Sequence, residues 1–127
     1  MSQAKDDITC HVLDTTAGRP AKGVPVRLEG PLNGGAVTTQ AFTSTTDADG
    51  RIKNWVSADG STGGLAGVLG QTSGATRWRL TFDTESYFGE GKTFFPEAVV
   101  VFRVERGQHY HVPLLLSPFT FTTYRGS

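Results

Sequence analysis

The stretch QAFTSTTDADGRIKNWV, residues 40–56, decides the fold class of this chain. Residues 40–46 are rich in β-branched and aromatic side chains, and a second strand-like run, residues 51–56, follows the tetrapeptide Asp-Ala-Asp-Gly. An Asp-Gly pair between two strand-like runs predicts a β-hairpin, because glycine adopts a positive φ without steric cost. We therefore expect Arg51 at the start of the second strand of a hairpin, where the turn holds its backbone.

Most of the other segments also alternate apolar and polar residues with a period of two, which is typical of half-buried strands. In Ile8–Asp14 one face holds Ile8, Cys10 and Val12, and the opposite face holds Thr9, His11 and Leu13. The apolar run Ala98–Phe102 predicts a strand that is covered on both faces. Strands are expected at residues 8–14, 24–29, 40–46, 51–56, 77–83, 96–104, 109–116 and 119–125, and a short helix within residues 84–91. This spacing predicts an all-β protein, an antiparallel β-sandwich of about eight strands with one short helix.

The chain has the length of one domain. Its 127 residues fall within the usual range for a single unit with its own core, so residues 1–127 are expected to form one domain. We expect residues 1–7 to be a flexible N-terminus. The glycine-rich residues 57–76 predict a long mobile loop, because little in that stretch can pack.

Composition excludes several classes of function. Twelve basic and 12 acidic residues give a formal net charge of zero, which removes the long-range attraction that nonspecific nucleic-acid binding needs. A single cysteine excludes an intramolecular disulfide and a zinc site built from several cysteines. No apolar run approaches the ~18 residues that a membrane span needs. The first residues lack the apolar core of a secretory signal, and the last residues are not a Ser-Lys-Leu address. A cytoplasmic or peroxisomal, not secreted, protein is expected.

The three histidines are the first candidates for chemistry. His11 interrupts an apolar strand, so it is either a core histidine satisfied by one hydrogen bond or a functional group. His109 and His111 stand two residues apart on one strand and therefore project from the same face. This is a familiar spacing of metal ligands, although no third ligand lies in phase with them. A metal-dependent cyclic amidohydrolase that uses this pair remains an alternative.

Arg51 and the segment Tyr124–Ser127 are the remaining candidates. Taken singly, each of these polar residues could be a solvated strand residue. However, Tyr124-Arg125-Gly126-Ser127 directly extends an apolar strand, which would hold the hydroxyl of Ser127 near the edge of a sheet.

Four motifs, in order along the chain, resemble those of the transthyretin-related proteins, and the last resembles the signature of the 5-hydroxyisourate hydrolase branch. They are His11-Val12-Leu13-Asp14, Thr46-Asp47-Ala48-Asp49-Gly50-Arg51, His109-Tyr110-His111-Val112-Pro113-Leu114-Leu115-Leu116-Ser117 and Tyr124-Arg125-Gly126-Ser127. The resemblance implies a transthyretin-like (prealbumin-like) sandwich. It also implies a homotetramer, a dimer of dimers, with active sites in the channel between dimers.

The resemblance further implies a reaction in purine breakdown. That reaction is the hydrolytic opening of 5-hydroxyisourate to 2-oxo-4-hydroxy-4-carboxy-5-ureidoimidazoline, with no cofactor and no metal. By motif, the family's catalytic residues fall on His11, Arg51 and His111, and the final tetrapeptide places Tyr124 and Ser127 at the same site. A role for His109 is not assigned. The glycine-rich residues 57–76 are longer than in compact members of the family.

These residue types suit water attack on a ring carbonyl. A neutral imidazole can take a proton from water near neutral pH, so His11 or His111 is expected to be the base. The other histidine, or Ser127, would pass a proton to the departing ring nitrogen. Arg51 would bind the planar substrate and stabilise the oxyanion, while Tyr124 orients the substrate. The alternative is a transthyretin-like carrier of a small ligand, a branch that lacks the histidine and arginine set and the final tetrapeptide.

Overall fold

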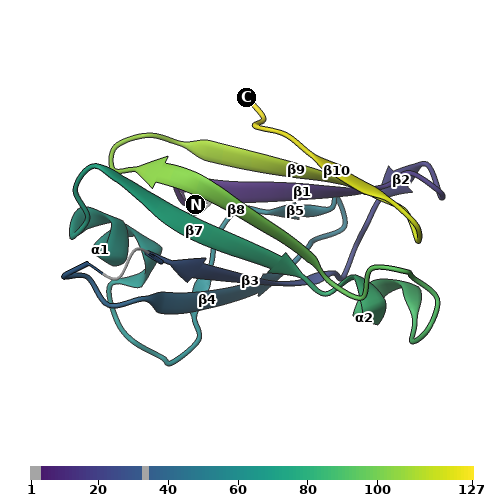
Figure 1. The fold of residues 1–127 in the computed structure, drawn as a ribbon, viewed down its shortest axis with the longest axis horizontal. Coiled ribbons are helices and arrows are strands. Elements are labelled where there is room, and N and C mark those ends of the chain that lie inside the picture. The colour runs from purple at the N-terminus through teal and green to yellow at the C-terminus, as the bar shows by residue number, and fades with distance from the viewer. Residues whose placement is uncertain (1–3, 33–34) are drawn as a thin grey trace.

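Two β-sheets pack face to face, and a short helix lies at each end of the sandwich (Figure 1). The computed structural model describes residues 4–32 and 35–127. The elements are β1 (Ile8–Asp14), β2 (Arg19–Pro20), β3 (Pro25–Gly30), β4 (Gln40–Thr45), β5 (Arg51–Ile52), β6 (Val56–Ser57), α1 (Gly64–Gly70), β7 (Ala75–Phe82), α2 (Thr84–Phe88), β8 (Ala98–Glu105), β9 (Tyr110–Leu116) and β10 (Phe121–Thr123). One sheet has the order β10-β9-β1-β2, with β5 paired to β1, and the other has the order β6-β4-β3-β7-β8. The predicted all-β sandwich is confirmed.

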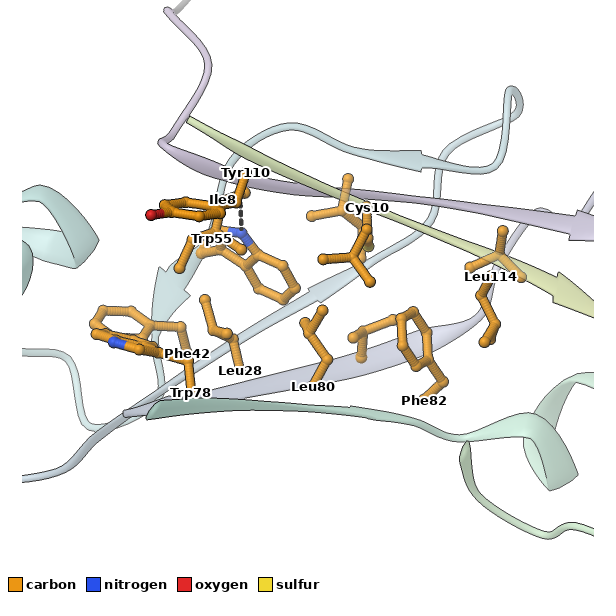
Figure 2. Close-up of a cluster of buried hydrophobic side chains, with 14 of the residues drawn as sticks. Ile8, Cys10, Leu28, Phe42, Trp55, Trp78, Leu80, Phe82, Tyr110 and Leu114 are labelled. Carbon is orange, nitrogen blue, oxygen red and sulfur yellow. Dashed lines mark hydrogen bonds between the residues drawn. The ribbon is translucent and has the colours of Figure 1, made fainter. Parts of the chain in front are cut away.

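The core fills the space between the two sheets (Figure 2). Ile8, Cys10 and Val12 of β1 are buried, as their alternation predicted. Trp78 and Phe82 belong to β7 of the facing sheet, and they are buried in the same core. Burying each large apolar side chain contributes about 1.5–3 kcal/mol. Because moving β1 by one residue would turn its apolar side chains outward, the core determines which face of this strand meets solvent.

The pairing of β1 with β9 is parallel, in contrast to the antiparallel arrangement that the sequence predicted for the whole sandwich. Its register runs from Ile8 opposite Tyr110 to Asp14 opposite Leu116. The two strands are far apart in the sequence, so no local turn dictates this direction. The consequence for the site is that the outward residues of β1 lie beside those of β9.

The expected hairpin over residues 40–56 does not form, although its turn does. Gly50 has a φ of 75°, and its backbone N–H donates to the carbonyl of Asp47. The carbonyl of Gly50, however, accepts from the N–H of Val12 at 2.7 Å, and β5 pairs with β1 rather than with β4. Because β3 and β6 already occupy both edges of β4, the chain crosses to the other sheet.

The glycine-rich residues 57–76 are not an extended loop. They contain α1, in which Leu65 and Leu69 are buried. Residues four apart lie on the same side of a helix, so these two leucines suffice to attach it to the core. The guanidinium of Arg106 also donates to the carbonyl of Gly70 at 3.0 Å. The described residues therefore hold two short helices where the sequence predicted one.

The expected flexible N-terminus falls partly outside the described residues, since residues 1–3 are not among them. Within the described part, the carbonyl of Ala4 accepts from the side-chain amide of Asn54 at 2.7 Å. The carboxylate of Asp6 accepts from the backbone N–H of Trp55 at 2.8 Å. The residues directly before β1 are thus hydrogen-bonded to the segment that follows β5.

Strand β8 is covered on one face only, which corrects the prediction for Ala98–Phe102. Val99 and Val101 are 44% and 54% exposed, because these side chains alternate away from the core. No helix in residues 4–32 or 35–127 is long and apolar enough to cross a membrane.

Candidate active site

Sheet register gathers the candidate residues on the outer face of the β10-β9-β1-β5 side of the sandwich. His11 of β1 stands opposite Arg51 of β5. Thr9, two residues before His11 and therefore on the same face, stands opposite His111 of β9. Three strands thus place four polar side chains together, although they come from distant parts of the sequence.

His11 is half-buried on this outer face and is not part of the core, so the interpretation as a core histidine is wrong. Its Nε2 lies 2.9 Å from the backbone carbonyl oxygen of Asp49. A carbonyl oxygen only accepts hydrogen bonds, so Nε2 must carry the hydrogen. In the neutral ring, Nδ1 is therefore the nitrogen with the free lone pair.

His111 lies beside His11, with 6.3 Å between the ring centroids. Its Nδ1 is 2.8 Å from Oγ1 of Thr9. Partial burial lowers the pKa of His111, and the positive charge of Arg51, followed by His11 and Lys5, lowers it further. His111 is therefore mainly neutral at neutral pH.

The turn before β5 positions Arg51 through its backbone. One carboxylate oxygen of Asp47 accepts from the N–H of Arg51 and from the N–H of Asp49, each at 2.9 Å. The hydrogen bond from Arg51 is the main reason that the pKa of Asp47 lies below its ordinary value. The carboxylate therefore stays ionised and keeps the turn closed at neutral pH.

Residues 124–127 run beside His111. The N–H of Gly126 donates to the carbonyl of His111 at 2.8 Å, which forms a bridge between the two residues. The guanidinium carbon of Arg125 lies 4.8 Å from the centre of the Tyr110 ring, a cation–π contact. These two contacts bring Ser127 to the rim of the pocket that His111 lines.

A pocket of about 270 Å³ opens on this face. Its lining includes Arg51, His111 and Ser127 of the expected set. His11 lies next to the pocket, through its pairing with Arg51 and its contact with the ring of His111. Tyr124 is 56% exposed and lines an adjoining groove of about 380 Å³ beside β8. The structure therefore brings His11, Arg51, His111 and Ser127 together, and it places Tyr124 in the neighbouring groove.

His109 and Cys10 also line this pocket, but neither has the features of a catalytic group or of a metal ligand. His109 is 81% exposed, and its Nδ1 lies 3.1 Å from the carboxylate of Asp7. No group of three or more histidines, cysteines or acidic residues within the described residues is arranged to hold a metal ion. Burial raises the pKa of the Cys10 thiol to about 12, so this thiol is not a nucleophile at neutral pH.

Sequence reasoning did not single out several polar residues that line the pocket, among them Thr9, Lys5 and Lys53. The outward face that Thr9 shares with His11 was a signal for Thr9, but its partner on β9 could not be read from the sequence. No local pattern marked the two lysines. With Arg51 they place three cationic side chains against the two carboxylates of Asp6 and Asp7 in the lining, so the pocket is polar and suits a polar ligand.

The fold and the site together define a β-sandwich protein with a pocket of two histidines, an arginine and a hydroxyl on the outer face of one sheet. The chain belongs to the HIUase/Transthyretin family, whose model matches residues 8–126.

Curated relatives share this sequence at moderate identity. The probable 5-hydroxyisourate hydrolase of Schizosaccharomyces pombe is 42% identical over 124 residues, which cover 94% of this chain and 90% of the relative. The uric acid degradation bifunctional protein TTL of Arabidopsis thaliana is 41% identical over 137 residues, and these cover 98% of this chain but 38% of that protein.

Solved structures agree with the fold. The 5-hydroxyisourate hydrolase of Klebsiella pneumoniae is 31% identical with a TM-score of 0.67, over 94% of this chain and 98% of that one. Sea bream transthyretin in complex with thyroxine is 29% identical with a TM-score of 0.71, over 95% of each chain. A 5-hydroxyisourate hydrolase and a transthyretin with bound thyroxine therefore share this fold, so the fold alone does not separate their activities.

Proposed function

We propose that this protein hydrolyses 5-hydroxyisourate to 2-oxo-4-hydroxy-4-carboxy-5-ureidoimidazoline in urate degradation. The observation that carries the proposal is the pocket on the outer face, where Arg51, His111 and Ser127 converge beside His11. Relatives named as 5-hydroxyisourate hydrolases support it, because they align with nearly the whole of this chain. The alternative, a carrier of a small aromatic ligand, is disfavoured by a pocket lined with charged and titratable groups.

In this proposal, Arg51 and the lysines of the pocket bind the substrate. The guanidinium of Arg51 is planar, permanently charged and able to donate several hydrogen bonds in one plane. It suits a flat heterocycle rich in carbonyl oxygens, and it suits the oxyanion that forms when one of these carbonyls is attacked. Lys5 and Lys53 line the same pocket, as do Asp6 and Asp7, so the lining offers charged partners of both signs to a polar substrate.

The chemical step is water attack on a ring carbonyl carbon. One imidazole of the pair formed by His11 and His111 takes a proton from the water, and the water oxygen bonds to the carbonyl carbon. When the carbon–nitrogen bond breaks, the ring nitrogen receives this proton and the carbon becomes a carboxylic acid, which releases its remaining proton to solvent as a carboxylate forms. Both histidines are suited to this exchange near neutral pH. The hydroxyl of Ser127 is in place to hydrogen-bond the reacting groups.

We further propose that the protein works as a homotetramer, a dimer of dimers. Strand β8 has an unpaired edge, and its outer face exposes Val99 and Val101. A sheet edge with apolar side chains is a ready site for pairing with a second chain. Native mass spectrometry tests the proposal directly: a species of four chains supports it, and a stable monomer at micromolar concentration contradicts it.

A coupled assay tests the activity. Urate and urate oxidase generate 5-hydroxyisourate in place, and its decay is followed by ultraviolet absorbance with and without this protein. Faster decay that survives treatment with a chelator, together with optical activity in the product, is the expected result. Decay at the spontaneous rate with folded protein present would refute the proposed function. Loss of the acceleration on chelation would favour the metal-dependent alternative at His109 and His111.

A further inference from the structure

We propose that Thr9 is a positioning residue whose hydroxyl holds the neutral ring of His111 with its hydrogen on Nε2, so that His111 acts as a hydrogen-bond donor rather than as the base. The inference rests on the proposed function for its kinetic consequence. The structural part, the hydrogen bond and the ring tautomer, stands on the geometry of the two strands alone.

The hydroxyl of Thr9 has two acceptors within reach. Nδ1 of His111 lies at 2.8 Å, and the carbonyl oxygen of Tyr110 lies at 3.5 Å. Hydroxyl donors prefer acceptors at about 2.7–2.8 Å, and a contact at the longer distance contributes little. The single hydrogen of the hydroxyl is therefore directed to Nδ1. Since Nδ1 then accepts, the hydrogen of the neutral ring must be on Nε2.

The strands hold this contact in place. Thr9 and His111 are direct partners in the parallel register of β1 and β9, and threonine has few side-chain rotamers on a strand. On the other side of the ring, Gly126 is close enough that a Cβ there would lie 2.7 Å from Cδ2 of His111. The imidazole is thus confined between Thr9 and residues 124–127. Its free nitrogen, Nε2, is the one available to a molecule in the pocket.

The neutral ring of His11 also carries its hydrogen on Nε2, but there this hydrogen is already used in a hydrogen bond within the protein. Its Nε2 donates to the carbonyl of Asp49, so the lone pair of the neutral ring is on Nδ1. One histidine of the pair is therefore prepared to accept a proton, and the other is prepared to donate a hydrogen bond. The burial and positive neighbours that lower the pKa of His111 oppose its protonation, as its role as a neutral donor requires.

These states assign the steps of the reaction. Nδ1 of His11 takes the proton of the attacking water, and the water oxygen bonds to the ring carbonyl carbon. Nε2–H of His111 and the guanidinium of Arg51 then hydrogen-bond the oxygen that becomes negative. When the carbon–nitrogen bond breaks, the imidazolium of His11 returns its proton to the departing nitrogen. His111 remains neutral throughout, and the second proton of the water leaves to solvent when the new carboxylic acid ionises.

The first test needs no substrate. Long-range proton–nitrogen correlation spectra of the 15N-labelled protein above pH 7 report which nitrogen of each neutral imidazole carries the hydrogen. Only three histidines are present, and the His111→Ala variant identifies the signals of His111. We expect the hydrogen of His111 on Nε2. A hydrogen on Nδ1 would overturn the inference, whether or not the protein hydrolyses 5-hydroxyisourate.

The second test is kinetic. Thr9→Val keeps the branched shape of the side chain and removes the hydroxyl, and we expect kcat to fall about tenfold, the effect of losing one hydrogen bond. KM should stay within about twofold, because the hydroxyl of Thr9 acts on His111 and not on the substrate. Thr9→Ser, which keeps the hydroxyl, should stay within about twofold of the wild type in kcat.

Thr15→Val is the matched control. The hydroxyl of Thr15 donates to the carbonyl of Leu116 at 3.1 Å, also between the β1 and β9 segments but away from the pocket. This variant should leave kcat and the His111 signals unchanged. An equal loss of kcat in Thr9→Ser and Thr9→Val, or a wild-type kcat in Thr9→Val, would overturn the inference. If the wild-type protein shows no turnover, the proposed function fails and the nuclear magnetic resonance result still decides the role of Thr9.

Discussion

Replacing Gly126 by alanine should reduce turnover while leaving the fold intact. Gly126 does not have a positive φ, so backbone conformation does not require glycine there. The lack of space for a side chain does require glycine, because an added Cβ would lie 2.7 Å from Cδ2 of His111 and 3.0 Å from Cγ of Pro113. Ordinary contact begins near 3.4 Å, so the first of these distances is about 0.7 Å too short.

The strain can be relieved in two ways, and both disturb the site. Either the ring of His111 tilts away, or residues 124–127 move outward and take Ser127 with them. Since a displacement of about 1 Å among reacting groups can cost about 100-fold in rate, we expect kcat to fall by roughly 10- to 100-fold. The free energy of unfolding should change by less than about 1 kcal/mol, because the core does not include this segment.

The measurement is kcat for 5-hydroxyisourate together with a thermal melt, for Gly126→Ala and for Gly70→Ala as the control. Gly70 has no atom within 4 Å of an added Cβ and lies in α1, so its variant should keep wild-type kcat. A wild-type kcat in Gly126→Ala would refute the idea that the close approach of Gly126 positions His111. A large drop in melting temperature would refute the view that this segment contributes little to stability.

His11→Ala should lower kcat by orders of magnitude with little change in melting temperature, because this side chain lies outside the core; unfolding of the variant would restore the interpretation as a core residue. Lys5→Gln removes one of the positive charges that lower the pKa of His111, so this pKa and the acidic limb of the profile of kcat/KM against pH should both move to higher pH. A proton chemical-shift titration of His111 that matches the wild type would contradict this. Gly30→Ala would place a Cβ inside the contact distance of the buried Trp78 indole, and overpacking of this kind costs about 1–3 kcal/mol, which urea unfolding would detect.

The sequence was informative where the physics is local. The alternation in β1 predicted that Ile8, Cys10 and Val12 would be buried, and they are. The same alternation put His11 on the opposite face, although the residue type alone left a core histidine open. The Asp-Gly signal was also correct about the turn, since Gly50 has the positive φ that it implies. Each of these features depends only on residues that are near one another in the chain.

The errors concern what each segment packs against. Turn chemistry cannot report that both edges of β4 are already occupied, and therefore the hairpin over residues 40–56 was wrong. Glycine content in residues 57–76 predicted a mobile loop, but Leu65 and Leu69 attach α1 to the core. Neither packing partner is adjacent in the sequence, so composition and spacing had no means of identifying it.

The sequence by itself therefore predicted most of the strands, the buried face of β1 and, through motif resemblance, the candidate residues of the site. Only the tertiary structure decided how these residues meet. Thr9 and His111 are 102 positions apart, and the parallel register of β1 and β9 makes them neighbours. That register results from burial of apolar side chains from both sheets, a cooperative property of the whole core. The hydrogen-bond partners of the two histidines, and hence their chemical roles, follow from it.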